Sequence, residues 1–209
     1  MAQIEEPKAF EESQLNELRR SIRVLGLKGL YFEVPQQPNI DDERFYPLWD
    51  ELLNLKVPLV LELGRPLTAE QYLEVVSKTL KVLKKLPDLK AIISVMGSNI
   101  RDAKDPEYVD IPKKILSLIK LPNVWYEIGY VLAFDKFDEY PYPLAQKMTR
   151  KIYEAVGADK LVWGADMPML MRTCTYRQAI DFVRRHCNFL SEAEKNLVLG
   201  ENAYKLLGI

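Results

Sequence analysis

The sequence KLVWGADMP, at residues 160–168, decides the fold of this chain. Residues 161–163 form a short apolar run that is typical of a buried strand, and Gly164 lets the backbone approach a neighbouring group closely. Asp166 follows where this strand gives way to a loop, and the carboxyl ends of buried strands are where α/β enzymes place their chemistry. Asp166 is therefore a candidate catalytic residue, and the capping of a turn before Pro168 is the alternative interpretation.

Strand and helix patterns alternate along the rest of the chain. Alternating apolar residues predict four further strands, and the amphipathic segments around them predict helices. The strands are expected at residues 28–34, 57–63, 89–96 and 123–128, and the helices at residues 11–25, 41–56, 68–85, 111–120, 144–156 and 175–187. A parallel neighbour can be reached only through a crossover, so strands separated by single helices predict a parallel sheet.

Helix starts and two longer loops are also predicted. Capping boxes pair Thr68 with Gln71, Thr175 with Gln178 and Ser191 with Glu194. The polar sequence GSNIRDAKDPE, at residues 97–107, is expected to be a loop. Residues 129–143 are rich in aromatic and acidic side chains, which suits a mobile cover over a site or a passive connection.

With 209 residues, 48% of them hydrophobic, the chain is long enough for one well-buried domain or at most two small ones, and a single domain over residues 1–209 is expected. The 29 basic and 30 acidic residues nearly cancel, which argues against nucleic acid and membrane as partners. No apolar run reaches the roughly 20 residues of a membrane helix, and the N-terminus is unlike a signal peptide, so we expect a cytoplasmic location. Cys174 and Cys187 are expected to be buried thiols.

One face of the predicted sheet is more polar than the other, most of all near the carboxyl ends of the strands. That face carries Tyr31, Glu33, Val60, Glu62, Ser94, Trp125, Glu127, Val162 and Asp166. In an open, doubly wound sheet helices would cover both faces and such polarity would be costly, whereas it is expected at the mouth of a barrel. No glycine-rich phosphate loop is present, so the sequence favours a parallel (β/α) TIM-barrel-like fold over a Rossmann-like one.

Several segments resemble one protein family. They are ERFYPLWDELLNLKVPLVLELG (residues 43–64), LKAIISVMG (89–97), LPNVWYEIG (121–129), KLVWGADMP and FLSEAEKNLVLGENAYKLLGI (189–209). Over about residues 12–209 the chain resembles the C-terminal two-thirds of the amidohydrolase-related metal-dependent hydrolases, which include decarboxylases of aromatic acids and lactone hydrolases. GADMP stands where the family has GSDxP, and LGENAYKLLG stands where it has a GGNAxRLFG-like tail.

The resemblance implies an incomplete barrel with a catalytic aspartate. About five of the eight strands would be present, with the N-terminal strands missing and residues 190–209 forming the closing helices. In the family the aspartate of the eighth strand binds metal and handles the proton of the attacking water, so the resemblance assigns that role to Asp166. It also implies a hydrolase or decarboxylase acting on a small carboxylated or cyclic substrate.

The family's histidine ligands are absent from this sequence. Residues 1–28 hold no His-x-His motif, Glu62 stands at the histidine of the fifth strand, and residues 94–96 replace that of the sixth. The one histidine, His186, is expected to be a half-buried helix residue. The cofactor that the resemblance implies is a divalent zinc, manganese or magnesium ion with Asp166 and Glu62 as ligands, and the missing imidazoles argue against zinc chemistry.

Charged residues near the strand ends are further candidates. Carboxylates crowded at one barrel mouth must bind a hard cation, pair with bases or hold protons at raised pKa values. The carboxylates are Glu33, Glu62, Glu127 and Asp166, and the arginines in the following loops are Arg65, Arg101 and Arg172. An arginine there can hold a substrate carboxylate by two hydrogen bonds, and ordinary solvated ion pairs are the alternative. The predicted substrate-binding residues are Arg172, Arg65, Glu127 and Tyr31.

Two classes of function follow. The first is an amidohydrolase-type enzyme with Asp166 as proton carrier or metal ligand and Glu62 as the second catalytic residue and replacement ligand. The second is a catalytically inactive, metal-free barrel fragment that serves as a scaffold or self-associates. An incomplete barrel needs cover for its edges, so we expect a homo-oligomer, a partner chain that completes the barrel, or closure on the N-terminal helix.

Overall fold

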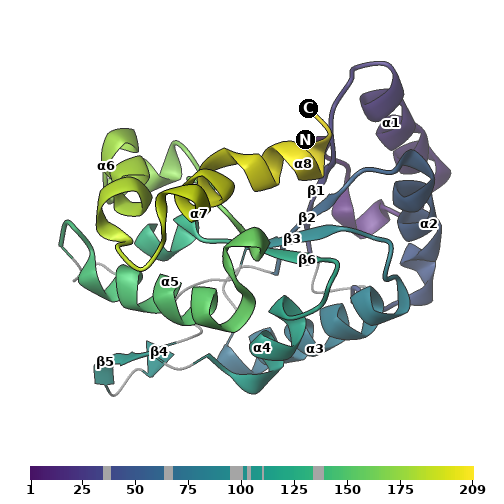
Figure 1. The fold of residues 1–209 in the computed structure, drawn as a ribbon. Helices are drawn as coiled ribbons and strands as arrows, with labels where there is room; N and C mark the ends of the chain where they lie inside the picture. Colours follow the sequence, from purple (N-terminus) through teal and green to yellow (C-terminus); the bar gives the residue numbers. More distant parts are fainter. Residues whose placement is uncertain (35–38, 64–67, 95–100, 103–104, 110, 134–138) are drawn as a thin grey trace. The chain divides into compact units, whose positions relative to one another are not determined.

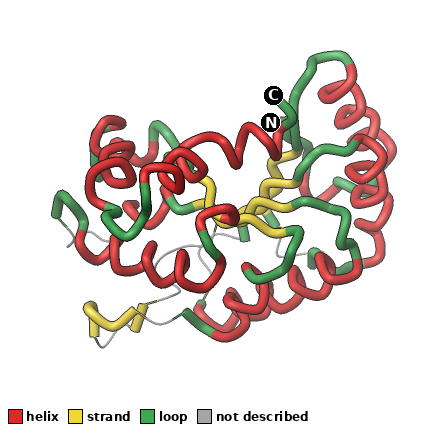
Figure 2. Tube along the Cα trace, in the orientation of Figure 1, coloured by secondary structure: helices red, strands yellow, loops and turns green. Residues whose placement is uncertain are grey.

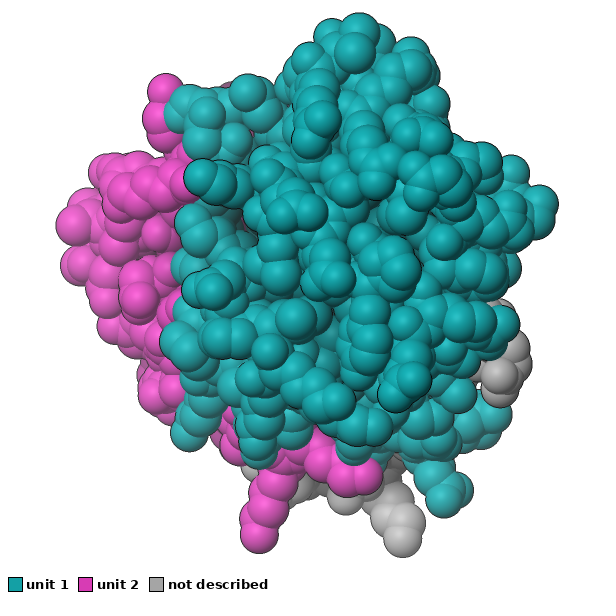
Figure 3. All heavy atoms as spheres, turned by 90° about the vertical axis from the view of Figure 1, so that its right-hand side faces the viewer, with its two compact units in different colours: residues 1–93, 117–125, 206–209 teal, residues 94–116, 126–205 magenta. Residues whose placement is uncertain are grey.

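The computed structural model describes residues 1–34, 39–63, 68–94, 101–102, 105–109, 111–133 and 139–209. The chain divides into two compact units, shown in different colours in Figure 3. The first comprises residues 1–93, 117–125 and 206–209, and the second comprises residues 94–116 and 126–205. The prediction of a single domain over residues 1–209 stays a prediction.

The structure contains a five-stranded sheet with the strands in the order β1-β2-β3-β6-β7. Figure 1 labels β1, β2, β3 and β6, and Figure 2 draws the strands in yellow. The strands are β1 (Leu30–Glu33), β2 (Leu59–Glu62), β3 (Ala91–Ser94), β6 (Val124–Glu127) and β7 (Leu161–Val162). Their spatial order is their sequence order, and β1 pairs with β2 and β6 with β7 in parallel. The predicted parallel α/β sheet is therefore confirmed.

The helices stand close to the predicted positions. They are α1 (Glu12–Arg23), α2 (Tyr46–Leu55), α3 (Ala69–Lys85), α4 (Lys113–Ile119), α5 (Pro143–Val156), α6 (Tyr176–Asp181), α7 (Glu192–Asn196) and α8 (Asn202–Leu207). Wider π-type turns at Phe182–His186 and Leu197–Glu201 continue α6 and α7. All three predicted capping boxes form, at Thr68, Thr175 and Ser191. In the part of the chain that the structure describes, none of the helices has the length and apolar character needed to cross a membrane.

Two predicted elements differ from the observed ones. The second helix was expected from residue 41, but Glu43–Phe45 forms a 3-10 turn and α2 begins at Tyr46. Pro47 has no backbone N–H, so it fits only the first turn of a helix. The predicted loop at residues 97–107 contains part of a hairpin, in which β4 (Arg101–Asp102) pairs with β5 (Asp105–Val109) in antiparallel orientation.

The faces of β1, β2 and β6 alternate as predicted, whereas Ile92 of β3 and Val162 of β7 are buried. In β1 and β2 every second residue, such as Phe32 and Leu61, is buried, and the residues between them, such as Tyr31 and Glu62, are half-buried. Phe32 packs edge-on against Phe45, with ring centroids 5.8 Å apart, on the buried face of the first unit. The half-buried face thus holds the polar side chains that the sequence placed near the strand ends.

The outer edge of β1 is covered by the beginning of the chain. Ala2 donates its N–H to the carbonyl of Gly29 at 2.7 Å and accepts the N–H of Tyr31 at 2.9 Å. The segment around Ala2 therefore lies parallel to β1 as a single bridge with Leu30. This contact resembles the predicted closure on the N-terminal side, although an extended segment rather than a helix makes it.

The outer edge of β7 is covered within the second unit by the turn before α8 and by the start of that helix. Asn202 Nδ2 donates to the carbonyl oxygen of Leu161 at 2.8 Å, and the N–H of Trp163 donates to that of Val198 at 2.9 Å. Residues 190–209 therefore act as closing helices, as expected. Oligomerisation and a completing partner chain stay predictions.

Candidate active site

Asp166 lies just beyond β7 in the second unit, and its side chain is exposed. Its φ angle is 39°, in the left-handed region that most residues with a Cβ atom avoid and that Asp adopts more readily than most. Its backbone carbonyl accepts the N–H of Leu170 at 3.2 Å, next to the 3-10 turn Met169–Arg172. The backbone of Asp166 thus takes part in the turn, while its carboxylate is left facing water.

Two glycines bring the ends of β6 and β7 together. Glu127 and Val162 are partners in the β6–β7 pair, and Gly129 and Gly164 each follow two residues later. A Cβ atom on Gly129 would stand 1.2 Å from the carbonyl oxygen of Gly164. The prediction that Gly164 allows a close approach is confirmed, and Gly129, which no sequence pattern marked, is its partner.

The carboxylate of Glu127 lies against Gly164. A Cβ atom on Gly164 would stand 2.0 Å from Oε1, 2.5 Å from Cδ and 3.0 Å from Cγ of Glu127. Glu127 is half-buried, and its neighbour Tyr126 is fully buried. Burial, and second the nearby charge of Glu127, raise the pKa of the Tyr126 hydroxyl. Glu127 is therefore placed beside the segment that carries Asp166.

Tyr31 and Glu62 meet in the first unit. The hydroxyl of Tyr31 donates a hydrogen bond to the Glu62 carboxylate. Glu33 is the partner of Glu62 in the β1–β2 pair, so both carboxylates stand at the carboxyl ends of their strands. Predicted site residues on neighbouring strands are thus brought together here, because parallel strands end at the same edge of a sheet.

The three arginines predicted near the strand ends lie in different surroundings. Arg172 is exposed at the end of the turn after Asp166 and makes no ion pair with any residue that the structure describes. Arg101 begins β4, and Arg65 lies outside the described residues. Part of the predicted cover, residues 134–138, also lies outside them, whereas Gly129–Ala133 forms a 3-10 helix.

His186 is the half-buried helix residue that the sequence predicted. It ends the π-type turn after α6, and its Nε2 lies 2.7 Å from the hydroxyl oxygen of Tyr140. The two rings are perpendicular, with centroids 5.0 Å apart. The one imidazole of the chain is thus engaged by a tyrosine.

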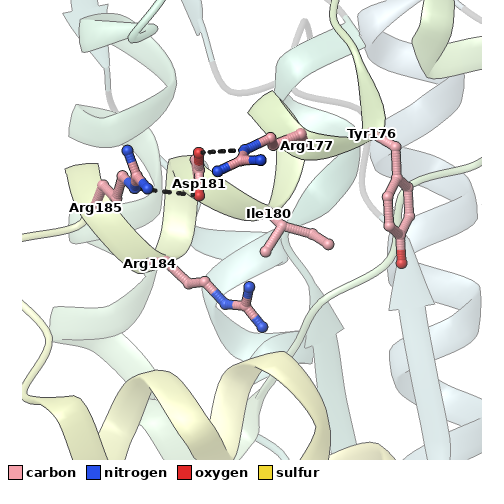
Figure 4. A pocket seen from close by; sticks show the side chains of 6 residues that line it. All are labelled: Tyr176, Arg177, Ile180, Asp181, Arg184 and Arg185. Atoms are coloured by element: carbon pink, nitrogen blue, oxygen red, sulfur yellow. Dashed lines mark ion pairs between the residues drawn. The ribbon is translucent and has the colours of Figure 1, made fainter.

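Figure 4 shows a hollow of about 370 Å³ on α6 and the turn after it. Its lining residues are Tyr176, Arg177, Ile180, Asp181, Arg184 and Arg185. Asp181 lies between Arg177 Nε at 3.8 Å and Arg185 Nε at 3.4 Å. Because every lining residue comes from one helical stretch, the hollow is an open space between long side chains rather than an enclosed cavity.

A family model for amidohydrolases matches residues 7–209 of this chain. The chain belongs to the amidohydrolase family. A comparison of this amidohydrolase with curated protein sequences found no significant match. The resemblance drawn from GADMP and the C-terminal tail is therefore confirmed at the level of the family.

Solved structures share the fold of this amidohydrolase. A dihydroxybenzoic acid decarboxylase from Polaromonas sp. JS666 is 17% identical with a TM-score of 0.65, over 94% of this chain and 65% of that one. A probable 2-pyrone-4,6-dicarboxylic acid hydrolase from Acinetobacter baumannii is 22% identical with a TM-score of 0.64, over 93% of this chain and 69% of that one. A TIM-barrel protein from Bordetella bronchiseptica is 20% identical with a TM-score of 0.65, over 99% of this chain and 65% of that one.

These similarities confirm the TIM-barrel-like fold class. The chain spans 65% of the length of the Polaromonas and Bordetella proteins. Its five parallel strands agree with the prediction of about five strands from an eight-stranded barrel.

A divalent ion, as predicted at Asp166 and Glu62, would need several donor side chains close together. The Polaromonas structure contains manganese, so a divalent ion is plausible for the family. Over the residues that the structure describes, no three His, Cys, Asp or Glu side chains lie close enough together to hold an ion. Catalytic zinc sites use three protein ligands, and manganese prefers a shell of several oxygens. The donors among the described residues do not fit such a centre.

Proposed function

We propose that this amidohydrolase is a hydrolase or decarboxylase of a small carboxylated or cyclic substrate, with Asp166 as proton carrier. The observation that carries the proposal is the position of Asp166: it is exposed, directly follows a strand end, and is held at a φ of 39°. Backbone strain of this kind clusters at functional sites. The names of the Polaromonas and Acinetobacter relatives support a carboxylated substrate.

Proton transfer is the chemistry that an exposed carboxylate can supply. In a hydrolysis, Asp166 would accept a proton from water while the water oxygen bonds to the carbonyl carbon of the substrate. Arg172, at the end of the turn that follows Asp166, would hold a substrate carboxylate through two parallel hydrogen bonds. The roles expected of Glu62, Tyr31 and Arg65 stay predictions.

A scaffold without activity is the second candidate function. The engagement of the single imidazole by Tyr140, and of the Glu62 carboxylate by Tyr31, favours it, because both candidate groups already have protein partners. A scaffold would gain nothing from the strained backbone at Asp166. Replacing that residue would then leave stability unchanged or improved.

The test compares wild type with Asp166→Asn on a panel of hydroxybenzoates, pyrone carboxylates and lactones, following release of CO₂ and ring opening. Asp50→Asn is the matched control, because Asp50 is an exposed aspartate on α2. We expect Asp166→Asn to lower kcat/KM roughly 100-fold or more and Asp50→Asn to have no effect. No turnover by wild type, with a more stable Asp166→Asn variant, would support the scaffold instead.

A further inference from the structure

We propose that Glu127 is the second reacting carboxylate of this amidohydrolase, and that Gly129 and Gly164 are there to admit it beside Asp166. The inference rests on the proposed function and adds a residue and a role to it. It starts from what the two glycines do in the fold.

Neither glycine is required by its backbone conformation. Among the glycines whose surroundings are resolved, positive φ angles occur at Gly26, Gly157 and Gly208, and not at Gly129 or Gly164. What Gly129 and Gly164 share is a lack of room for a Cβ atom. Both positions are therefore glycine because the ends of β6 and β7 pack too closely for a Cβ atom.

The room that Gly164 leaves is taken by a carboxylate. The three atoms nearest to a Cβ on Gly164 are Oε1, Cδ and Cγ of Glu127, at 2.0, 2.5 and 3.0 Å. Packing alone would be served better by an apolar side chain, because a carboxylate on a half-buried face loses hydration. The close approach of the two strand ends thus places a carboxylate directly beside the backbone that leads to Asp166.

The Glu127 carboxylate lies against Gly164, which precedes Asp166 by two residues. Asp166 is two residues beyond Gly164, and consecutive Cα atoms are about 3.8 Å apart, so its Cα lies within about 8 Å of that of Gly164. Two carboxylates at neighbouring strand ends can divide acid and base roles between them.

The two carboxyl groups can hydrolyse a cyclic ester by proton transfer alone. Asp166 takes one proton from water, whose oxygen bonds to the acyl carbon of a cyclic ester, and the ring C–O bond breaks. Protonated Glu127 gives its proton to the leaving oxygen, which becomes a hydroxyl group. One proton passing from Asp166 to Glu127, directly or through solvent, restores both carboxyl groups.

Gly164→Ala is the sharpest test, because the added methyl group meets the flexible end of Glu127 and can push it aside while the fold persists. Gly200→Ala is the matched control, since a Cβ on Gly200 meets nothing within 4 Å. The measurement is kcat/KM on a cyclic or carboxylated substrate for wild type, Glu127→Gln, Gly164→Ala, the double variant, Gly200→Ala and Asp166→Asn.

We expect Glu127→Gln and Gly164→Ala each to lower kcat/KM roughly 100-fold, and the double variant to fall no further than the worse single variant. The alkaline limb of the pH profile should move in Glu127→Gln, and Gly200→Ala should match wild type. Full activity of Glu127→Gln beside an inactive Asp166→Asn would overturn this inference and leave the proposed function standing. No turnover by wild type would overturn both.

Discussion

Tyr31 donates its hydroxyl hydrogen to the carboxylate of Glu62, across the pair formed by β1 and β2. The two residues are 31 positions apart in the sequence, and their meeting depends on the parallel register. Both were predicted from the sequence to belong to a reaction site. Removing this hydrogen bond therefore tests whether the carboxyl ends of β1 and β2 are arranged as the structure shows.

Tyr31→Phe removes this hydrogen bond while keeping the ring. We expect the free energy of unfolding, measured by urea denaturation, to fall by about 1.5–3 kcal/mol, because a charged acceptor loses its donor. Tyr204→Phe is the control, since Tyr204 is an exposed tyrosine on α8. An equal, negligible change in both variants would show that the bond does not stabilise the fold.

Gly129→Ala tests the contact between the ends of β6 and β7. The added Cβ would stand 1.2 Å from the carbonyl oxygen of Gly164, a backbone atom that cannot rotate away. We expect a loss of about 3 kcal/mol or more in thermal unfolding, at the upper end of overpacking effects. Gly200→Ala should be neutral or stabilising by up to about 1 kcal/mol, and a Gly129→Ala protein as stable as wild type would contradict the geometry.

Asn123 holds the loop between α3 and β3. Its Nδ2 lies within hydrogen-bonding distance of the carbonyl oxygens of Leu83, Leu86 and Leu89, at 3.2, 3.0 and 3.0 Å. Asn123→Ala leaves buried carbonyls without this donor, and we expect about 2–3 kcal/mol of destabilisation in a denaturant titration. Asn54→Ala, at an exposed position of α2, should change stability by less than about 0.5 kcal/mol.

Cys187 gives a prediction for alkaline pH. Burial raises its pKa from 9.0 to about 12 in the folded protein. Between these values the unfolded chain loses the thiol proton and the folded chain keeps it. Stability contributed by this group is therefore full below pH 9 and is lost as the pH rises toward 12, by at most about 1.4 kcal/mol per pH unit.

The measurement is the free energy of unfolding of wild type and Cys187→Ala from pH 8 to pH 11, together with thiol labelling at pH 8. The slope should be shallower in the variant, and both buried thiols, Cys174 and Cys187, should react only after denaturation. Rapid labelling of Cys187 in the native protein would be incompatible with its burial.

Local pattern was enough to predict the strands, the faces of β1 and β2, and the three helix starts marked by capping boxes. Phe32 and Glu62 fall on the expected faces because side chains alternate along a strand whatever the rest of the chain does. Thr68, Thr175 and Ser191 cap helices through bonds within three residues. The hairpin at β4 and β5 was overlooked because its residues are polar and short strands leave little periodicity to detect.

The candidate site could be predicted only in part. Asp166 was predicted from its place after a buried strand and its role stays a prediction, whereas the need for space at Gly164 is confirmed. That Gly129 and Glu127 occupy this space depends on contacts between residues distant in sequence, which no local pattern records. A glycine after a strand ordinarily indicates a turn, so Gly129 carried no separate signal.

The central claim is that Asp166 carries the proton in an amidohydrolase reaction on a small carboxylated or cyclic substrate. The most direct measurement is kcat/KM of wild type and Asp166→Asn on the best substrate of the panel, with Asp50→Asn alongside. The account predicts a loss of roughly 100-fold or more at Asp166 and none at Asp50. Equal turnover by wild type and Asp166→Asn would contradict it.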